Sequence, residues 1–287
     1  MSTLYVAATP IGNLEDLTDR VKRIFSESDL ICAEDTRVTQ KLLNHLGLHK
    51  NVISCHRHNE ALKCDSIIEQ MTENDMNVML VCDAGTPGIS DPGYILVDAA
   101  WKAGFRVIPV SGPNAAATAV SCSGFDAREF AFYGFLPREK KALREKLAAI
   151  LDTGIQCAVI YESPHRVLEL AETMGEIWPG SRVCVDCDLT KYYEKIYRGD
   201  IDAVITEMRA NDKLEKGEYC IVADLSGVKR SEKKTNDVSA AAFMLEQLLN
   251  GSDIAGAARS ASEAGYPRNT VYRDRLRIEE MFEDDCL

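Results

Sequence analysis

Short apolar segments alternate with helical patterns through most of the chain, and this alternation restricts the fold more than any other feature. In the first half, each apolar run of strand length comes before a stretch with helical spacing. The expected strands cover 4–9, 29–34, 51–55, 77–82 and 105–110, and the helices between them cover 17–28, 36–47, 61–74 and 92–103. This order of strands and helices predicts a mostly parallel sheet with helices on both faces.

A second α/β set begins near residue 118. Its expected strands cover 129–135, 155–162, 182–190 and 218–225, and its helices cover 140–151 and 164–177. The C-terminal residues have only helical patterns, and two short helices around "AGYPRN" resemble a helix-turn-helix unit. The sequence therefore predicts an N-terminal α/β domain (1–117), a second α/β domain (118–226), a basic linker (227–235) and a helical extension (236–287).

Charge and composition narrow the function classes. The chain has 287 residues, a formal net charge of −12 and 46% hydrophobic residues. No apolar run approaches the roughly 20 residues of a membrane span, and the N-terminal "MSTLYVAATPIGN" lacks the features of a signal peptide. We therefore expect a soluble, cytoplasmic protein with no membrane partner. The acidic balance disfavours general affinity for nucleic acids, but screening over about 10 Å lets a local basic patch act independently.

The ten cysteines are scattered along the chain, and several lie inside apolar strands. For a chain without a leader, we expect these cysteines to be small buried side chains with reduced thiols. Cys184 and Cys187 form one CxxC pair, but no second pair or nearby histidine completes a zinc set. We therefore expect no metal site.

Loops rich in turn-forming residues follow several of the expected strands. The clearest is "VCDAGTPGISDPG" (81–93), and "TPIGNLEDLT" (9–18), "SGPNAAATA" (111–119) and "YESPHR" (161–166) have a similar character. In open α/β sheets, ligands bind beyond the carboxyl ends of the strands. The chain has no GxGxxG, GxxxxGK[ST] or GxSxG motif. These loops therefore predict a ligand held by backbone groups and small side chains.

Eight motifs in order carry a family resemblance over residues 3 to about 225. They are "ATPIGNLEDLT", "AEDTRVTQKLLNHLG", "HRHNE", "DAGTPGISDPG", "SGPNAAATA", "GFLPR", "YESPHR" and "LTK" followed by "YRGD". Together they resemble the tetrapyrrole methylase superfamily, in the branch that methylates the ribose 2′-hydroxyl of a cytidine in 16S ribosomal RNA of the small ribosomal subunit. The helical tail is also similar to the C-terminal extension of that branch.

The resemblance implies two α/β domains of the tetrapyrrole methylase type, a ligand cleft between them, S-adenosylmethionine (SAM) in that cleft, and a homodimer. Porphyrin methylases of the superfamily have a GxGxGD-type first loop. In this chain Pro10 and Asn13 stand where Gly and Asp are usual, and the RNA branch shares that difference. The departure disfavours porphyrin chemistry.

The cofactor residues implied by the resemblance lie in the strand-end loops. They are Thr9, Pro10, Asp83, Gly85, Ile89, Asp91, Ala115, Ala116, Tyr161, Glu162 and Ser163. Structural roles remain open for several of them. Asp83 and Asp91 are also good caps for a turn or helix, Ser163 is a good helix N-cap, and Tyr161 could belong to the core.

Methyl transfer to a ribose hydroxyl needs a positioned acceptor, and a nearby side chain could take its proton or orient it. The expected cleft contains several carboxylates, among them Glu34, Asp91 and Glu162. Our catalytic candidates are Asp35, Glu60, Asp83 and Lys191.

Basic and histidine-bearing segments are candidates for contacts with RNA phosphates. They supply Arg37, His56, Arg57, His58, Arg138, Lys140, Lys141, Arg144 and Arg166. An ion-pair network around Arg37 and a solvated helix face over 137–146 are the competing explanations.

Two other functions stay open on the sequence. One is methylation of a small tetrapyrrole or corrin acceptor by the same fold, and the other is a non-catalytic ribosome-binding protein. SAM binding separates the last from both enzymes, and dependence on RNA separates the two enzymes from each other.

Overall fold

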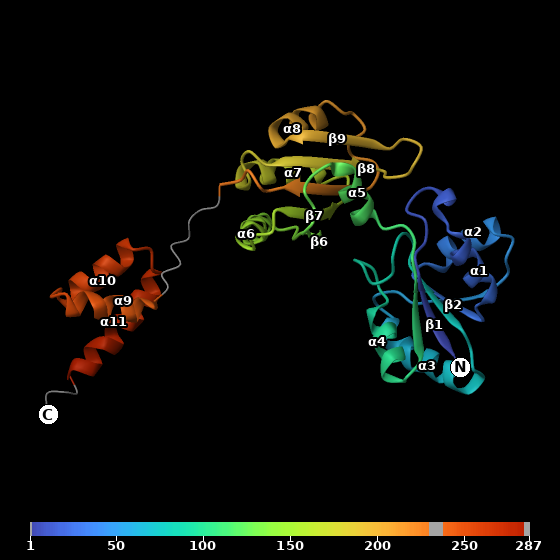
Figure 1. Ribbon diagram of the computed structural model, residues 1–287, viewed down its shortest axis with the longest axis horizontal. Helices are drawn as coiled ribbons and strands as arrows, with labels where there is room; N and C mark the ends of the chain where they lie inside the picture. Colours follow the sequence, from blue (N-terminus) through green and yellow to red (C-terminus); the bar gives the residue numbers. More distant parts are fainter. Residues whose placement is uncertain (1, 230–237, 284–287) are drawn as a thin grey trace. The chain divides into compact units, whose positions relative to one another are not determined.

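The computed structural model describes residues 2–229 and 238–283. These residues form two compact units, one up to Lys229 and one after it. The first unit contains two five-stranded sheets, and the second is helical. Figure 1 labels many of the elements of both units.

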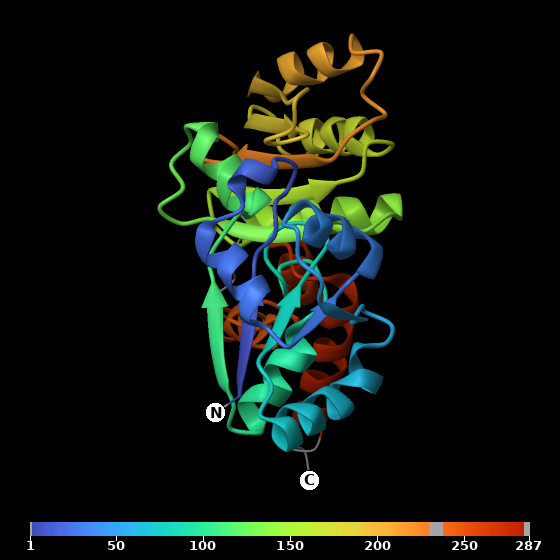
Figure 2. The ribbon, with the colours of Figure 1, turned by 90° about the vertical axis from the view of Figure 1, so that its right-hand side faces the viewer.

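The first sheet is entirely parallel, as the alternation of strands and helices predicted. Its strands are β1 (Thr3–Ala7), β2 (Leu30–Ala33), β3 (Asn51–Ser54), β4 (Val78–Val81) and β5 (Arg106–Val110). They have the order β3-β2-β4-β1-β5. Figure 2 shows β1, in blue near the N-terminus, beside β5 in green. The carboxyl ends of all five strands therefore lie at one edge of this sheet.

Helices cover both faces of the first sheet, which confirms the layered arrangement. Helices α1 (Asp19–Glu27) and α2 (Thr36–His45) pack on one face, and α3 (Glu60–Asn74) and α4 (Tyr94–Lys102) pack on the other. Every residue of β2 and β4 is buried as a result. Because both faces of these strands are buried, their sequences are continuously apolar and do not alternate between apolar and polar residues.

The second sheet is mixed, and one of its strands was not predicted. Its strands are β6 (Ala131–Phe135), β7 (Cys157–Glu162), β8 (Arg182–Cys187), β9 (Lys195–Asp200) and β10 (Tyr219–Asp224), in the order β6-β7-β10-β8-β9. Only β6 and β7 pair in parallel; β10 is antiparallel to both of its neighbours, and β8 to β9. The edge strand β9 escaped prediction because it is mostly exposed and its apolar signal is weak. The helix α8 (Ile201–Arg209) was also missed, although its buried residues Ile201, Val204, Ile205 and Met208 have helical spacing.

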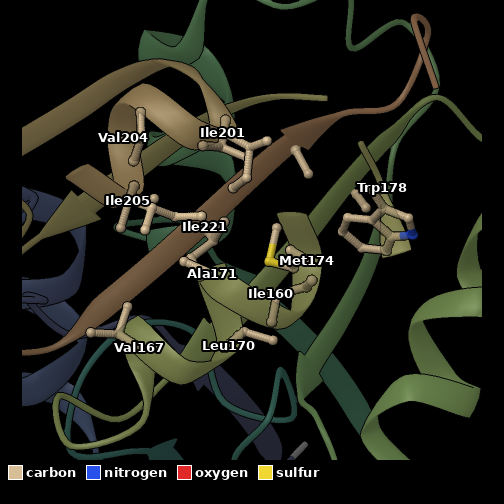
Figure 3. Packing of buried hydrophobic residues seen from close by; sticks show 14 of the residues in the cluster. Ile160, Val167, Leu170, Ala171, Met174, Trp178, Ile201, Val204, Ile205 and Ile221 are labelled. Atoms are coloured by element: carbon tan, nitrogen blue, oxygen red, sulfur yellow. The ribbon is translucent and has the colours of Figure 1, made fainter. Parts of the chain in front are cut away.

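The main core of the second sheet lies under α6 (Lys140–Asp152), α7 (Val167–Ile177) and α8. Figure 3 shows side chains of α7 and α8 meeting Ile160 of β7 and Ile221 of β10. Helix α5 (Ala115–Ser123) packs on the opposite face, against β7, β8 and β10. The two faces of this sheet are thus covered by helices from different parts of the chain.

The packing of α5 bears on the expected boundary at residue 117. That residue lies inside α5, and α5 packs against the second sheet rather than the first. A boundary inside one continuous helix would divide a single packed element. We therefore place the division between the two α/β parts before Ala115.

The C-terminal unit has three helices, as expected from its pattern. They are α9 (Ala240–Leu249), α10 (Ile254–Glu263) and α11 (Arg268–Glu283), and each pair of them is in contact. Met244, Ala257 and Val271 are among the side chains of their common core. Most of the expected linker, 230–235, lies outside the described residues. Among the helices that the structure describes, none is long and apolar enough to cross a membrane.

Candidate functional site

A cavity of about 360 Å³ lies where the strand-end loops of the first sheet meet the second sheet. Seven of the predicted cofactor residues line it: Gly85, Ile89, Asp91, Ala115, Tyr161, Glu162 and Ser163. Sequence reasoning missed other lining residues, namely Ile11, Ala84, Thr86, Ser90, Asn114, Phe135, Pro164, Leu189, Glu218, Tyr219 and Cys220. Several of these residues lie next to predicted cofactor residues in the sequence, so the turn-rich loops after the strands already pointed to them. Glu218, Tyr219 and Cys220 come from β10 or the residue before it, and no local signal pointed to them.

The loop after β4 owes its shape to residues with positive φ. Gly85, Gly88 and Gly93 have φ values of 84°, 81° and 132°, and Ser90 has 67°. Glycine adopts this region without steric cost, whereas a residue such as Ser90 is strained there. Reciprocal backbone hydrogen bonds of 2.8 and 2.9 Å join Thr9 to Gly85 and hold the first loop against this one. The concentration of glycine and proline therefore builds one wall of the cavity.

The beginning of α5 forms a second wall. Asn114 caps this helix, because its side chain accepts a hydrogen bond from the Ala117 N–H at 3.0 Å. The Ala116 N–H donates to the Tyr161 hydroxyl oxygen at 3.0 Å, so Ala116 supports the wall without lining the cavity. Tyr161 also meets Phe132 and Phe135 edge to face. Burial raises the pKa of Tyr161 to about 12, so its hydroxyl stays protonated at neutral pH.

Glu162 is the most buried acidic residue of the cavity, with 2% of its surface exposed. Its Oε1 accepts hydrogen bonds from the Ser163 N–H and hydroxyl at 2.7 and 3.1 Å, and its Oε2 lies 3.3 Å from Arg166. Arg166 also donates to the Pro137 carbonyl. The hydroxyl of Ser163 is thus used by Glu162 and does not cap α7, which has no side-chain cap.

Four acidic residues interact near the ends of β2 and β4, namely Glu34, Asp35, Asp83 and Asp91. The Asp83 N–H donates a long hydrogen bond of 3.5 Å to Glu34 Oε2, and Asp83 Oδ1 accepts a hydrogen bond from the Asp35 N–H at 2.9 Å. Burial raises the pKa of Asp83, Asp91 and Glu34, and the charges of Asp91 and Asp83 add to the effect on Glu34. A raised pKa makes a carboxylate a better proton acceptor once it is ionised.

Three of the catalytic candidates have other partners in the structure. Asp35 caps α2 and pairs with the exposed Arg37, which holds the pKa of Asp35 at about 2 and leaves it a weak base. Glu60 is 1% exposed, and its Oε1 accepts from the N–H groups of Ile95 and Leu96 at the start of α4. The structure therefore gives Glu60 a helix-capping role away from the cavity.

Lys191 is held by two carboxylates, Asp188 at 2.7 Å and Glu218 at 2.9 Å. Burial lowers the pKa of Lys191, but these hydrogen bonds outweigh burial and the net shift is upward. A lysine that stays protonated cannot accept a proton. Lys191 can still position a group, because its partner Glu218 lines the cavity.

Thr9, Pro10 and Asp83 line a neighbouring cavity of about 250 Å³ instead of the first one. Lys41 and His45 of α2 also line it. The residue after Asp83, Ala84, belongs to the wall of the first cavity. Asp83 therefore lies at the border between the two cavities. Thr9 is buried, and its hydroxyl donates a hydrogen bond to the Cys82 carbonyl.

Seven of the nine predicted RNA contacts fall into two groups, and the other two, Arg37 and Arg166, pair with Asp35 and Glu162. Near the β3 end, His56 and His58 lie 6.1 Å apart, and Arg57 donates to the Ser90 carbonyl of the cavity loop at 3.2 Å. On α6, the lysines and Arg144 form ion pairs with acidic residues on α6 and α7: Lys140 with Glu169, Lys141 with Glu145, and Arg144 with Glu176. Arg138 is exposed just before α6. Surface ion pairs of this kind are worth little and can exchange a partner for a phosphate.

The fold of the two α/β sheets is similar to that of solved methyltransferase structures. The methyltransferase CobJ matches with a TM-score of 0.59 at 16% identity, over 80% of this chain and 97% of that one. A uroporphyrin-III C-methyltransferase from Thermus thermophilus matches with a TM-score of 0.51 at 17% identity, over 78% and 96%. At these identities the likeness shows the fold alone. The class of protein is thus a two-domain α/β protein with the fold of these methylases.

The sequence itself identifies the family. The family model described as tetrapyrrole (corrin/porphyrin) methylases matches residues 3–205, and the chain belongs to this family. Relatives named ribosomal RNA small subunit methyltransferase I are similar over most of their length. The one from Halalkalibacterium halodurans is 43% identical over 79% of this chain and 77% of its own length. Those from Xylella fastidiosa and Escherichia coli O157:H7 are each 37% identical, over 94% and 95% of this chain and 97% and 94% of their own.

Proposed function

We propose that the protein is a SAM-dependent methyltransferase that methylates the ribose 2′-hydroxyl of a cytidine in 16S ribosomal RNA of the small ribosomal subunit. The observation that carries the proposal is the identity of 37–43% to relatives named for small-subunit ribosomal RNA methylation. The cavity built from the family's strand-end loops supports it. The choice of the cytidine 2′-hydroxyl rests on the resemblance of the sequence motifs.

The first cavity fits the proposed cofactor in size and chemistry. Its volume of about 360 Å³ is in the range of small-molecule sites. Ile11, Ile89 and Leu189 offer apolar contact, the first turn of α5 offers backbone groups, and Asp91 and Glu162 offer negative charge. A bound SAM would supply a cationic sulfonium and its activated methyl group. We assign its binding to Gly85, Ile89, Asp91, Ala115, Tyr161, Glu162 and Ser163.

Asp83 is our candidate for the residue that orients the acceptor hydroxyl or takes its proton. It stands at the border of the two cavities, and burial raises the pKa of its carboxyl group. Glu34 and Asp91 are close enough to influence the charge of this cluster. The neighbouring cavity, with Lys41 and His45, is the place that we assign to the acceptor nucleotide, because the cationic side chain of Lys41 suits a phosphate.

We infer that the substrate is the assembled subunit rather than naked RNA. With a formal net charge of −12, general attraction to phosphates is weak. A structured ribonucleoprotein can be recognised by shape as well as by charge. Arg57, Arg138 and the basic residues of α6 are the contacts that we propose. A homodimer and a cytoplasmic location remain predictions from the sequence.

The deciding experiment combines methyl-labelled SAM with purified protein and small subunits that lack the modification. We expect label on a ribose 2′-oxygen of a single cytidine of 16S RNA, located by nuclease mapping. Small subunits that already carry the mark serve as the matched control and take up no label. SAM binding is measured separately by calorimetry. Binding without label on RNA would overturn the RNA assignment and direct the search to small acceptors, whereas absent binding would overturn the assignment of the cavity.

A further inference from the structure

Two cysteines and an aspartate meet between α5 and β8, on the face of the second sheet opposite its main core. Cys122 lies in the last turn of α5, and Cys184 and Asp186 lie on β8. One potential ligand atom from each residue lies within 4.8 Å of the other two. Residues two apart on a strand point to the same face, which explains why Cys184 and Asp186 both point to α5.

Asp186 is the unusual member of this cluster. It is completely buried, and its Oδ2 has no hydrogen-bond partner among the described residues. Its Oδ1 has only two weak thiol donors, Cys122 Sγ at 3.5 Å and Cys184 Sγ at 3.7 Å. Burial raises the pKa of Asp186 to about 6, and the charge of Glu194 adds to the effect. A buried carboxylate oxygen without a partner is costly unless a cation or a donor satisfies it.

We propose that Cys122, Cys184 and Asp186 form a binding site for a thiophilic divalent cation of the zinc type. Two thiolates and one carboxylate are a donor set that Zn²⁺ and Co²⁺ accept. On binding, each thiol would lose its proton to solvent, and the metal would bond to both sulfur atoms and to the carboxylate. Cys122 is exposed and gives the ion a path from solvent. Three protein ligands leave a fourth position free for a water molecule.

The CxxC pair of the sequence is not the basis of this site. Cys187 lies on the opposite face of β8 from Cys184, and it packs against the main core under α6, α7 and α8. Its Sγ is near the Lys216 carbonyl instead. Alternation along the strand therefore separates the two cysteines that the motif joins.

The place of the site indicates a structural role toward the first cavity. The metal would join the last turn of α5 to β8, and the first turn of the same helix lines the cavity through Ala115. Cys220 of β10 pairs in register with Asp186 and also lines the cavity. A bound ion would thus fix the wall of the cavity without taking part in chemistry there.

The test uses the full-length protein, stripped of metal under reducing conditions and titrated with Co²⁺ alone. We expect about one equivalent of Co²⁺ per chain, a thiolate-to-cobalt charge-transfer absorption, and a higher thermal midpoint on binding. Cys122→Ser should remove most of the charge-transfer absorption, and Asp186→Asn should weaken binding while keeping the absorption. Cys187→Ser is the matched control, on the same strand but the opposite face, and should bind as the unchanged protein does.

Three results would overturn the site. The first is no charge-transfer absorption at saturating Co²⁺. The second is binding that Cys187→Ser abolishes and Cys122→Ser leaves intact. The third is binding that a weak chelator removes completely, which would be adventitious contact with exposed thiols. Cys122 is exposed, so its serine variant should fold, and circular dichroism checks this; the conclusion does not depend on variants of the buried Cys184.

Discussion

Asp83 shows how one residue can serve both the loop and the chemistry. It follows a completely buried strand, accepts the Asp35 N–H, and lines the cavity next to the proposed cofactor site. We expect Asp83→Asn to lower the rate of RNA methylation by about 100-fold, because the amide cannot accept the hydroxyl proton. SAM affinity, measured by calorimetry, should change little. An unchanged rate would remove Asp83 from the proposed mechanism.

Asp91 provides a prediction on pH dependence. Burial raises its pKa, so the folded protein holds this proton more tightly than the unfolded chain does. The contribution of Asp91 to stability is therefore most favourable below its ordinary pKa of 3.8 and is lost as pH rises through the raised value. We expect Asp91→Asn to raise the midpoint of urea unfolding at pH 7 and to have less effect in acid. A variant that is less stable at pH 7 would contradict this.

At the scale of elements, Glu60 connects two helices. It is the first residue of α3, and its carboxylate accepts two backbone N–H groups at the start of α4. We expect Glu60→Ala to lower the free energy of unfolding by about 2 kcal/mol, since both donors lose a buried acceptor. Glu60→Gln keeps one acceptor oxygen and should lose less. Chemical denaturation measures both, and equal losses would argue against the capping role.

The loop after β4 depends on its glycines. Gly85 has a φ of 84° and lines the cavity, so Gly85→Ala adds backbone strain of roughly 1–2 kcal/mol where the cofactor is proposed to bind. We expect weaker SAM binding by calorimetry. Gly47→Ala is the matched control, because Gly47 has a similar φ of 67° with open space around it and lies after α2. Equal loss of binding in both variants would mean that general destabilisation is responsible.

At the scale of the whole molecule, we expect the two compact units to have different functions, SAM binding in the first and contact with RNA in the second. The cavity lies wholly within the unit that ends at Lys229, and α11 of the other unit begins at Arg268 and also includes Arg273, Arg275 and Arg277. We expect deletion of 236–287 to weaken methylation of small subunits and to leave SAM binding intact. Filter assays on subunits and calorimetry with SAM measure the two effects. Loss of SAM binding would mean that the helical unit supports the first one.

The sequence by itself determined the order of most strands and helices and the composition of the loops between them. These features depend on local patterns: apolar runs for strands such as β2 and β4, helical spacing for the helices, and glycine with proline for the loop after β4. The local patterns predicted loops that bind a ligand, and the family resemblance of those loops implied the individual residues Gly85, Asp91 and Tyr161, which line the first cavity. The three C-terminal helices were predictable from local patterns as well.

Only the tertiary structure decided which distant residues meet. The direction of β10 between β7 and β8 brings Glu218, Tyr219 and Cys220 to the cavity, and no local pattern encodes the direction in which a strand pairs. The packing of α5 places Cys122 beside Asp186 and not beside the second cysteine of the CxxC pair. Glu60 accepts hydrogen bonds from two N–H groups at the start of α4, and these contacts form only when α3 and α4 pack together. Local spacing determines elements, whereas long-range pairing and burial determine which side chains share a site.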